Sequence, residues 1–323
     1  MLKKISILIT SYNSAEFIGG AIQSALAQTY QNIEVIVADD GSRDNSQQII
    51  SRLAAKNTKI IPIFSDINRG LSFNWNLGLS KCSGEYVATL AGDDLMLPNK
   101  VSEQMRFLEE HPDYGLCTHD MDVFESETGK TLYLTSERFR MPQKAGIELM
   151  FSTNWFFKKA TKNIPSSIMG RGDFLRGHKF DERLKFWNEF LYMIDCMATS
   201  GKKWSHLPEV LGRYRVHDKQ IHTSKEAIDL SFEEALIALA IASRRYPELS
   251  KLIKNKRDYL LFQNLVFDWH KPEKRKALED QFRREAGFIK WLYMKLCHSY
   301  LHHRTLFEKT SFLRKAVKKV FQE

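Results

Sequence analysis

The stretch that decides the fold is YVATLAGDD, which runs from Tyr86 to Asp94. Its first five residues, up to Leu90, predict a short buried strand, and Asp93 and Asp94 follow as adjacent carboxylates. Adjacent carboxylates repel each other and are costly to keep ionised unless a cation lies between them. Mg²⁺ or Mn²⁺ carrying a diphosphate would meet that need. A solvated turn before a helix is the alternative, because Pro98 suits a first helical turn.

Two more apolar runs end in polar clusters. Ile5–Ile9 is followed by TSYNS, and Ile33–Ala38 is followed by DDGSRD. Continuous apolar runs separated by helical stretches indicate strands buried on both faces of a parallel sheet. Ligands of such sheets bind outside the carboxyl ends of the strands. The polar residues expected at this common edge are Thr10, Tyr12, Asp39, Asp40, Asp93 and Asp94.

The rest of the first 134 residues alternates between helical and extended patterns, which predicts a doubly wound, mainly parallel α/β sheet. Ser14 is a candidate cap for the first helix, and Ser42 or Asp44 for the second. From 136 to 163 the sequence is irregular, with one short helix around 145–151. The expected helices are 15–28, 45–56, 72–81 and 99–110, and the further strands are 59–64, 116–124 and 131–134.

Charge is distributed unevenly along the 323 residues. Residues 225–323 contain 21 Lys and Arg against 13 Asp and Glu, a net charge of +8, so only +1 of the overall +9 belongs to residues 1–224. This predicts a body over 1–224 and a basic helical extension over 225–323. The four cysteines lie far apart without a CxxC pair, and because Met1–Lys4 leads directly into a predicted strand, no signal peptide is expected. A reducing, cytoplasmic setting is therefore expected.

Two long runs carry a family resemblance. They are SILITSYNSAEFIGGAIQSALAQTYQNIEVIVADDGSRDNS and NRGLSFNWNLGLSKCSGEYVATLAGDDLMLP. The first begins at Ser6 and the second at Asn68, and their four motifs closely resemble family 2 glycosyltransferases with the GT-A fold. The likeness is strong over roughly 4–110, looser to about 224 and absent beyond. It implies a nucleotide-sugar-binding half over 1–110 and an acceptor and catalytic-base half over 111–224.

The resemblance implies a nucleotide site at the ends of the first two strands. Thr10, Tyr12, Asn13 and Asp40 would bind the nucleotide, and a UDP-sugar is the expected donor. A carboxylate can accept from the imide N–H of uracil, and a tyrosine ring offers a flat face for stacking. A capped turn with a packed ring is the alternative for Thr10 and Tyr12, and Asp39 could serve only to shape the turn.

The resemblance also implies a Mn²⁺ or Mg²⁺ ion on the donor diphosphate. Asp93 would contact the ribose or the metal, and Asp94 would ligate the metal. Many relatives have a further Asp where this chain has Ala91, which leaves the metal requirement open. Many also have Arg where this chain has Trp75. The positive charge beside the diphosphate would then come from Arg69 or be missing.

The second half supplies the remaining expected groups. Glu189 occupies the family's place for the catalytic base that opens a helix, and a surface carboxylate near a helix N-terminus is the alternative. Asp195 is the fallback base. Arg215 would bind phosphate oxygens, and His217 would add a ligand or hydrogen bond, unless both belong to a strand that points to solvent. Ser166 would line the acceptor side.

The C-terminal extension suggests separate roles. Cys297 and His298, His302 and His303 have helical spacing that could suit zinc, but solvated histidines on a basic helix are the favoured interpretation. Apolar residues from Phe288 onward recur with basic neighbours, as in an amphipathic helix. We expect the last helix to contact anionic lipid on the inner face of the cell membrane. Docking onto the body or a second subunit is the alternative, favoured for the earlier helices.

Together these features predict an inverting, metal-assisted transfer of a sugar to a hydroxyl of a glycan or lipid-linked glycan, in surface polysaccharide synthesis. A metal-dependent nucleotidyltransferase is an alternative, although a Gly-rich basic loop should then follow the first strand, and TSYN stands there instead. A nucleic-acid-binding protein would explain the basic extension, but the body is nearly neutral and no recognised module is visible. A dinucleotide oxidoreductase is disfavoured because no GxGxxG follows the first strand.

Overall fold

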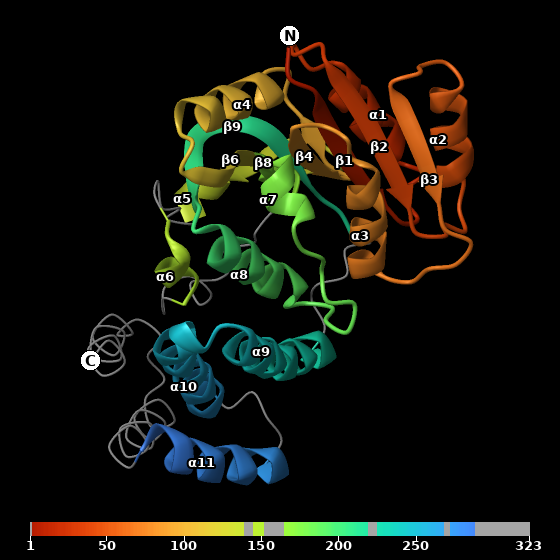
Figure 1. The fold of residues 1–323 in the computed structure, drawn as a ribbon. Coiled ribbons are helices and arrows are strands. Elements are labelled where there is room, and N and C mark those ends of the chain that lie inside the picture. The colour runs from red at the N-terminus through yellow and green to blue at the C-terminus, as the bar shows by residue number, and fades with distance from the viewer. Residues whose placement is uncertain (1, 139–144, 152–164, 219–224, 268–271, 288–323) are drawn as a thin grey trace. The chain divides into compact units, whose positions relative to one another are not determined.

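The computed structural model describes residues 2–138, 145–151, 165–218, 225–267 and 272–287 (Figure 1). The chain divides into two compact units. The first contains residues 1–149 and 158–221, and the second contains 150–157 and 222–323.

The described part of the first unit contains a mixed sheet in the order β3-β2-β1-β4-β8-β6-β9-β5, with β7 paired to β6. Strands β1 to β4 run parallel, as does the β6–β9 pair, whereas β5, β7 and β8 pair antiparallel. The predicted mainly parallel α/β sheet is therefore confirmed. The strands are β1 (Ile5–Ser11), β2 (Ile33–Asp39), β3 (Ile60–Phe64), β4 (Tyr86–Ala91), β5 (Leu95–Met96), β6 (Tyr114–Glu125), β7 (Thr131–Leu134), β8 (Met169–Arg171) and β9 (Lys203–Val216).

Helices cover both faces of the parallel strands (Figure 1). Ile5, Ile7 and Ile9 of β1 share a buried core with residues of α1, α2 and α4. On the other face, a Cβ added to Gly78 of α3 would lie 2.5 Å from Leu8, so glycine allows this helix its close approach. The helices are α1 (Ile18–Leu26), α2 (Ser46–Ala54), α3 (Leu71–Lys81), α4 (Lys100–Glu110), α5 (Thr135–Arg138), α6 (Ile147–Met150), the 3₁₀ turn η1 (Pro165–Ser167), α7 (Gly172–Arg176) and α8 (Asn188–Ser200).

The strand register brings the three predicted polar clusters to one edge. Thr10 of β1 lies opposite Ala38 of β2 on one side and Ala91 of β4 on the other. The backbone N–H of Gly92 donates to the carbonyl of Thr10 at 2.9 Å. The turn after β2 and the turn after β4 therefore both border the end of β1.

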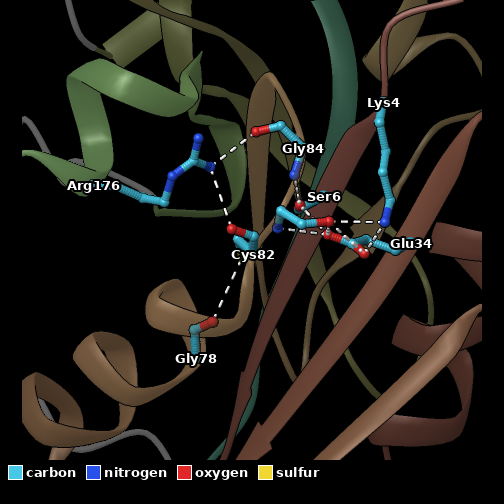
Figure 2. A network of polar contacts seen from close by, with 8 residues as sticks. Lys4, Ser6, Glu34, Gly78, Cys82, Gly84 and Arg176 are labelled. Atoms are coloured by element: carbon cyan, nitrogen blue, oxygen red, sulfur yellow. Dashed lines mark hydrogen bonds and ion pairs between the residues drawn. The ribbon is translucent and has the colours of Figure 1, made fainter.

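The opposite, amino-terminal edge of the sheet holds a buried polar network (Figure 2). The carboxylate of Glu34 accepts from the Ser6 hydroxyl at 2.6 Å and from the Ser83 N–H at 2.7 Å, and it pairs with Lys4 at 2.5 Å. Arg176 donates to the carbonyl of Gly84 at 2.8 Å. Burial alone would raise the pKa of Glu34, but the hydrogen bonds from Lys4, Ser6 and Ser83 outweigh burial and lower that pKa. This edge is thus held together by a satisfied, ionised carboxylate.

Some boundaries differ from those expected. Helix α1 begins at Ile18 and not at Ala15, because Phe17 and Ile18 both donate to the carbonyl of Ser14 in a turn. The hydroxyl of Ser14 bonds to the carbonyl of Tyr12 and does not cap the helix. At the start of α2 the N-cap position is occupied by Asn45 and by neither Ser42 nor Asp44, although Asp44 accepts the N–H of Ser46 at 3.0 Å.

The described part of the second unit, within residues 225–287, is helical, as predicted for the extension. Phe232 of its first helix and Leu261 of the next are among its buried residues. No helix in the described residues is long and apolar enough to cross a bilayer. Residues 288–323, with the expected membrane-contacting helix and the Cys297 and histidine group, lie outside the described residues. The described elements are α9 (Lys225–Arg245), η2 (Pro247–Leu249), α10 (Ser250–Phe267) and α11 (Pro272–Ala286).

Candidate functional site

The two aspartates after β2 have different tasks. Asp39 is buried, and its carboxylate accepts from the Ser42 N–H at 2.9 Å, the Ser42 hydroxyl at 2.6 Å and Gln47 at 3.0 Å. Asp40 accepts the backbone N–H groups of Arg69 and Gly70, at 2.9 and 2.7 Å. Asp39 therefore shapes its own turn, whereas Asp40 holds the loop that follows β3 to the end of β2.

The end of β1 presents one exposed ring beside this turn. Tyr12 is 39% exposed. Asn13 has a positive φ of 49° and receives the backbone N–H of Arg43 on its side chain at 2.9 Å, while its own N–H donates to Ser42 at 2.8 Å. Thr10 is partly buried one residue before the strand ends. The turns after β1 and β2 are thus fastened together, which leaves the ring of Tyr12 available for stacking.

Asp93 forms a pair with a histidine that is distant in sequence. Its Oδ2 lies 3.1 Å from Nε2 of His217, with side chains 28% and 13% exposed. The ring of His217 packs against Phe17 at a centroid separation of 4.8 Å. Nδ1 of His217 is buried and has no hydrogen-bond partner within the described residues. Sequence reasoning did not single out Phe17, and nothing in the local sequence marks it, because its partner is 200 residues away.

Asp94 is held on both sides by the protein. It is 1% exposed, its Oδ1 accepts the backbone N–H of Arg215 at 2.8 Å, and its Oδ2 accepts the hydroxyl of Ser166 at 2.5 Å. Burial and the neighbouring Asp93 raise the pKa of Asp94, while the two hydrogen bonds act the other way. The two adjacent carboxylates therefore face different surroundings.

The side chain of Arg215 is enclosed near the same corner. Its guanidinium lies 4.8 Å from the ring centre of Phe17 and 4.7 Å from that of Phe124, and its Nε donates to the carbonyl of Asp93 at 2.8 Å. Burial lowers the pKa of Arg215, which stays far above neutrality because a guanidinium does not lose its proton in proteins. Arg215 thus places a permanent positive charge beside the Asp93 turn.

A small cavity adjoins this corner through η1. Ser166 of η1 bonds to Asp94, and the preceding Pro165 lines a cavity of about 10 Å³ that also contains Glu189. The space is room for about one water molecule. The other lining residues are mostly apolar: Trp75, Leu116, Ile168, Leu175, Phe180, Tyr192 and Met193.

Glu189 lies in the first turn of α8, as predicted. Burial among these apolar side chains raises the pKa of Glu189 to about 7. A carboxyl with such a pKa can exchange a proton near neutral pH, which suits a general base. Asp195 is buried in the middle of the same helix.

The side-chain contacts of Trp75 and Arg69 are with residues outside the Asp93 turn. Trp75 is 5% exposed and stacks on Phe180 with a centroid separation of 4.8 Å, as part of the wall around Glu189. The guanidinium of Arg69 lies 3.5 Å from the ring centre of Phe73. Among the groups predicted to supply positive charge, Arg215 is the one whose contacts place it at this turn.

The donor atoms at Asp93 and His217 fit a divalent cation. In the described part of the chain, no cluster of three or more His, Cys, Asp or Glu side chains could hold a metal ion. Two protein ligands suffice when substrate phosphates and water complete the coordination, as is usual for Mg²⁺. Neighbouring ligands of an octahedral ion, at about 2.1 Å from it, lie about 3 Å apart. The separation of 3.1 Å between Nε2 of His217 and Oδ2 of Asp93 is that of a hydrogen bond, and it also leaves the two atoms close enough to bind one ion.

Two of the solved structures that resemble this chain are complexes with a nucleotide or a nucleotide-sugar. TarS 1–349 of S. aureus in complex with UDP aligns with a TM-score of 0.57 and 17% identity, over 93% of this chain and 92% of that one. The mannosyltransferase PcManGT from Pyrobaculum calidifontis, in complex with GDP-Man and Mn²⁺, aligns with a TM-score of 0.59 and 15% identity, over 100% and 86%. At these identities the likeness establishes the fold, which is of the GT-A type.

Sequence relatives identify the family. An uncharacterized glycosyltransferase of Rickettsia typhi is 31% identical over 217 residues, which is 67% of this chain and 65% of that protein. Glycosyltransferase GlyG of Streptococcus pneumoniae is 26% identical over 190 residues, or 56% of this chain and 63% of GlyG. The aligned part thus spans slightly less than two thirds of these relatives.

The sequence profile described as glycosyl transferase family 2 covers residues 6–177, which include the turns after β1, β2 and β4 and the Ser166 contact. More than half of the chain therefore matches the family. The chain belongs to glycosyl transferase family 2.

Proposed function

We propose that this protein transfers a sugar from a nucleotide-sugar to a hydroxyl group of an acceptor, with inversion at the anomeric carbon. The observation that carries the proposal is the pairing of two unlike sites across η1. On one side, Asp93 and His217 offer partly exposed donor atoms at the carboxyl edge of the parallel strands. On the other side, Glu189 lies in a small apolar cavity with its pKa raised to about 7.

The donor nucleotide is expected to bind over the ends of β1 and β2. Tyr12 offers an exposed ring for stacking on a base. Asp40 is buried and its two oxygens already accept the backbone N–H groups of Arg69 and Gly70, so it would shape the base site through the loop that it holds. A UDP-sugar is the proposed donor, as the family resemblance implies. The UDP complex of TarS supports this choice by fold analogy.

Asp93 and His217 would hold Mn²⁺ or Mg²⁺ with the donor diphosphate. When bound, the cation supplies Lewis-acid stabilisation of the negative charge that develops on the leaving group. Arg215 would contribute a fixed positive charge close to the same turn. Ser166, which is predicted to line the acceptor side, contacts Asp94, and its neighbour Pro165 lines the Glu189 cavity.

Glu189 would act as the general base. The acceptor hydroxyl oxygen attacks the anomeric carbon, its proton passes to the carboxylate of Glu189, and the bond from that carbon to the diphosphate breaks. This is one displacement from the face opposite the leaving group, so the configuration inverts. The proposed acceptor is a glycan or lipid-linked glycan, by analogy with the family.

The test is a screen of nucleotide-sugars for release of nucleoside diphosphate, with Mn²⁺, with Mg²⁺ and with a chelator. We expect release from a UDP-sugar in the presence of a divalent ion, and its loss on chelation and in Asp93→Asn. Asp113→Asn is the matched control, because this exposed carboxylate is also paired, with Lys203, and directly precedes β6, at the end of the β6–β9 pair opposite to Arg215. Binding of a nucleotide-sugar without any transfer to water or to glycan acceptors would contradict the proposal.

A further inference from the structure

We propose that Asp94 is a positioning residue which fastens three segments of the site, and that it is not a metal ligand. This inference rests on the proposed function only for the identity of the ion. Its starting point is that both oxygens of Asp94 already have protein donors at 2.8 and 2.5 Å, and that the residue is 1% exposed. A metal ligand needs a free lone pair directed at the ion, and Asp93 retains more of that freedom.

The three segments that Asp94 joins each carry a group of the proposed site. Asp94 itself follows Asp93 in the turn after β4. Its contact with the Arg215 N–H fixes the end of β9, two residues before His217. Its contact with Ser166 fixes η1, whose Pro165 lines the Glu189 cavity.

We call Asp94 with its two partners, Ser166 and Arg215, the clamp. Further contacts hold the η1 end of the clamp. The Ser166 hydroxyl also accepts the backbone N–H of Ala91 at 2.9 Å. The carbonyl of Ser167 accepts from Gln104 at 2.9 Å, and the carbonyl of Ile168 accepts from the buried Lys100 at 3.2 Å. Since η1 is fixed from β4 and α4 in this way, Asp94 connects the end of β9 to a rigid support.

The chemistry of the clamp separates it from a ligand role. In Asp94→Asn the amide oxygen can still accept from the Arg215 N–H, and the amide nitrogen can donate to the Ser166 hydroxyl oxygen. A clamp therefore tolerates asparagine and fails with alanine. A metal-ligating carboxylate would be damaged by both substitutions, because a neutral amide lacks the charge that favours the cation.

The experiment measures Mn²⁺ affinity of the full chain in the presence of UDP, by the free-Mn²⁺ EPR signal, for wild type, Asp93→Asn, Asp94→Asn, Asp94→Ala and Ser166→Ala. We expect Asp94→Asn to remain within about threefold of wild type and Asp93→Asn to lose at least tenfold. Asp94→Ala and Ser166→Ala should weaken Mn²⁺ binding in parallel. A loss in Asp94→Asn as large as that in Asp93→Asn would overturn the proposal.

Melting temperatures in metal-free buffer provide a readout that does not depend on ion binding. The clamp predicts that Asp94→Ala melts several degrees below Asp93→Ala, because Asp94→Ala removes the acceptor of two donors, the Arg215 N–H and the Ser166 hydroxyl, whereas Asp93→Ala removes the partner of one imidazole nitrogen of His217. Equal melting temperatures for Asp94→Ala and Asp93→Ala would overturn the positioning role of Asp94, even if wild type bound no Mn²⁺. Conversely, the clamp stands and the proposed function falls if the predicted melting order appears in a protein that transfers no sugar.

Discussion

The two edges of the parallel sheet treat their buried carboxylates in opposite ways. At the amino-terminal edge, hydrogen bonds and the Lys4 ion pair lower the pKa of Glu34 despite its burial. At the carboxyl edge, burial raises the pKa of Asp94, and in the adjoining cavity it raises that of Glu189 to about 7. The ionised Glu34 therefore stabilises the fold at the amino-terminal edge. Keeping Asp94 and Glu189 ionised at the carboxyl edge costs stability. Strained electrostatics of this kind are concentrated where chemistry is expected.

The largest effect should come from removing the reactive carboxylate at the carboxyl edge. Glu189→Gln keeps the shape of the side chain but cannot take a proton, so we expect sugar transfer to fall about 10²- to 10⁴-fold with little change in UDP affinity. Initial rates of UDP release and calorimetric titration with UDP would measure the two quantities. Glu209→Gln, an exposed position on β9, is the control. Retention of more than a tenth of the transfer rate by Glu189→Gln would remove Glu189 from the base role.

An intermediate effect should come from the amino-terminal edge. Glu34→Gln places an amide N–H toward groups that themselves donate, so we expect the free energy of unfolding to fall by about 1–3 kcal/mol at pH 7. Since the pKa of Glu34 is lowered by folding, its charge stabilises the fold above the unfolded pKa of about 4.5, and this contribution is lost as pH falls below it. Urea denaturation at pH 7 and pH 3.5 would measure the difference between wild type and variant. If Glu34→Gln lowers the free energy of unfolding equally at both pH values, the charge of Glu34 is not what stabilises this edge. Glu85→Gln is the exposed control on the same edge.

A stability effect of similar size and opposite sign is expected at the Glu189 cavity. Folding raises the pKa of Glu189 from 4.5 to about 7, so the folded state binds the proton more tightly, and stability should decline as pH rises from about 4.5 to about 7. Glu189→Gln removes this dependence and should be more stable than wild type at pH 8 by about 1–3 kcal/mol. The gain should vanish near pH 4.5. Thermal denaturation across this range would test it, and a variant that is less stable than wild type at pH 8 would refute the raised pKa.

Much of this architecture could be predicted from the sequence because its signals are local. Apolar runs such as Ile33–Ala38 indicate strands buried on both faces, and their polar followers lie at the shared edge as expected. The position of Glu189 in the first turn of α8 was also readable from its neighbours. The apolar pattern of a segment predicts its secondary structure correctly where burial of those apolar residues determines that structure.

The different roles of adjacent residues could not be read in this way. Asp93 and Asp94 look equivalent in sequence, and what separates them is contact with Ser166 and Arg215, which lie 72 and 121 positions from Asp94. Trp75 occupies an expected arginine position, yet its stacking on Phe180 places it in the core. Such distinctions depend on which distant segments meet, and no local periodicity encodes that.

The route of β9 has a consequence for how the protein is made. This strand is the last in the sheet, and it returns residues 215 and 217 to a turn that left the ribosome more than 120 residues earlier. A nascent chain that has displayed only its first 110 residues contains the neighbouring strands β3, β2, β1 and β4, but it lacks β9, with which β5 pairs, and half of the proposed ion-binding pair. The proposed donor binding would therefore wait until nearly the whole first unit has been synthesised.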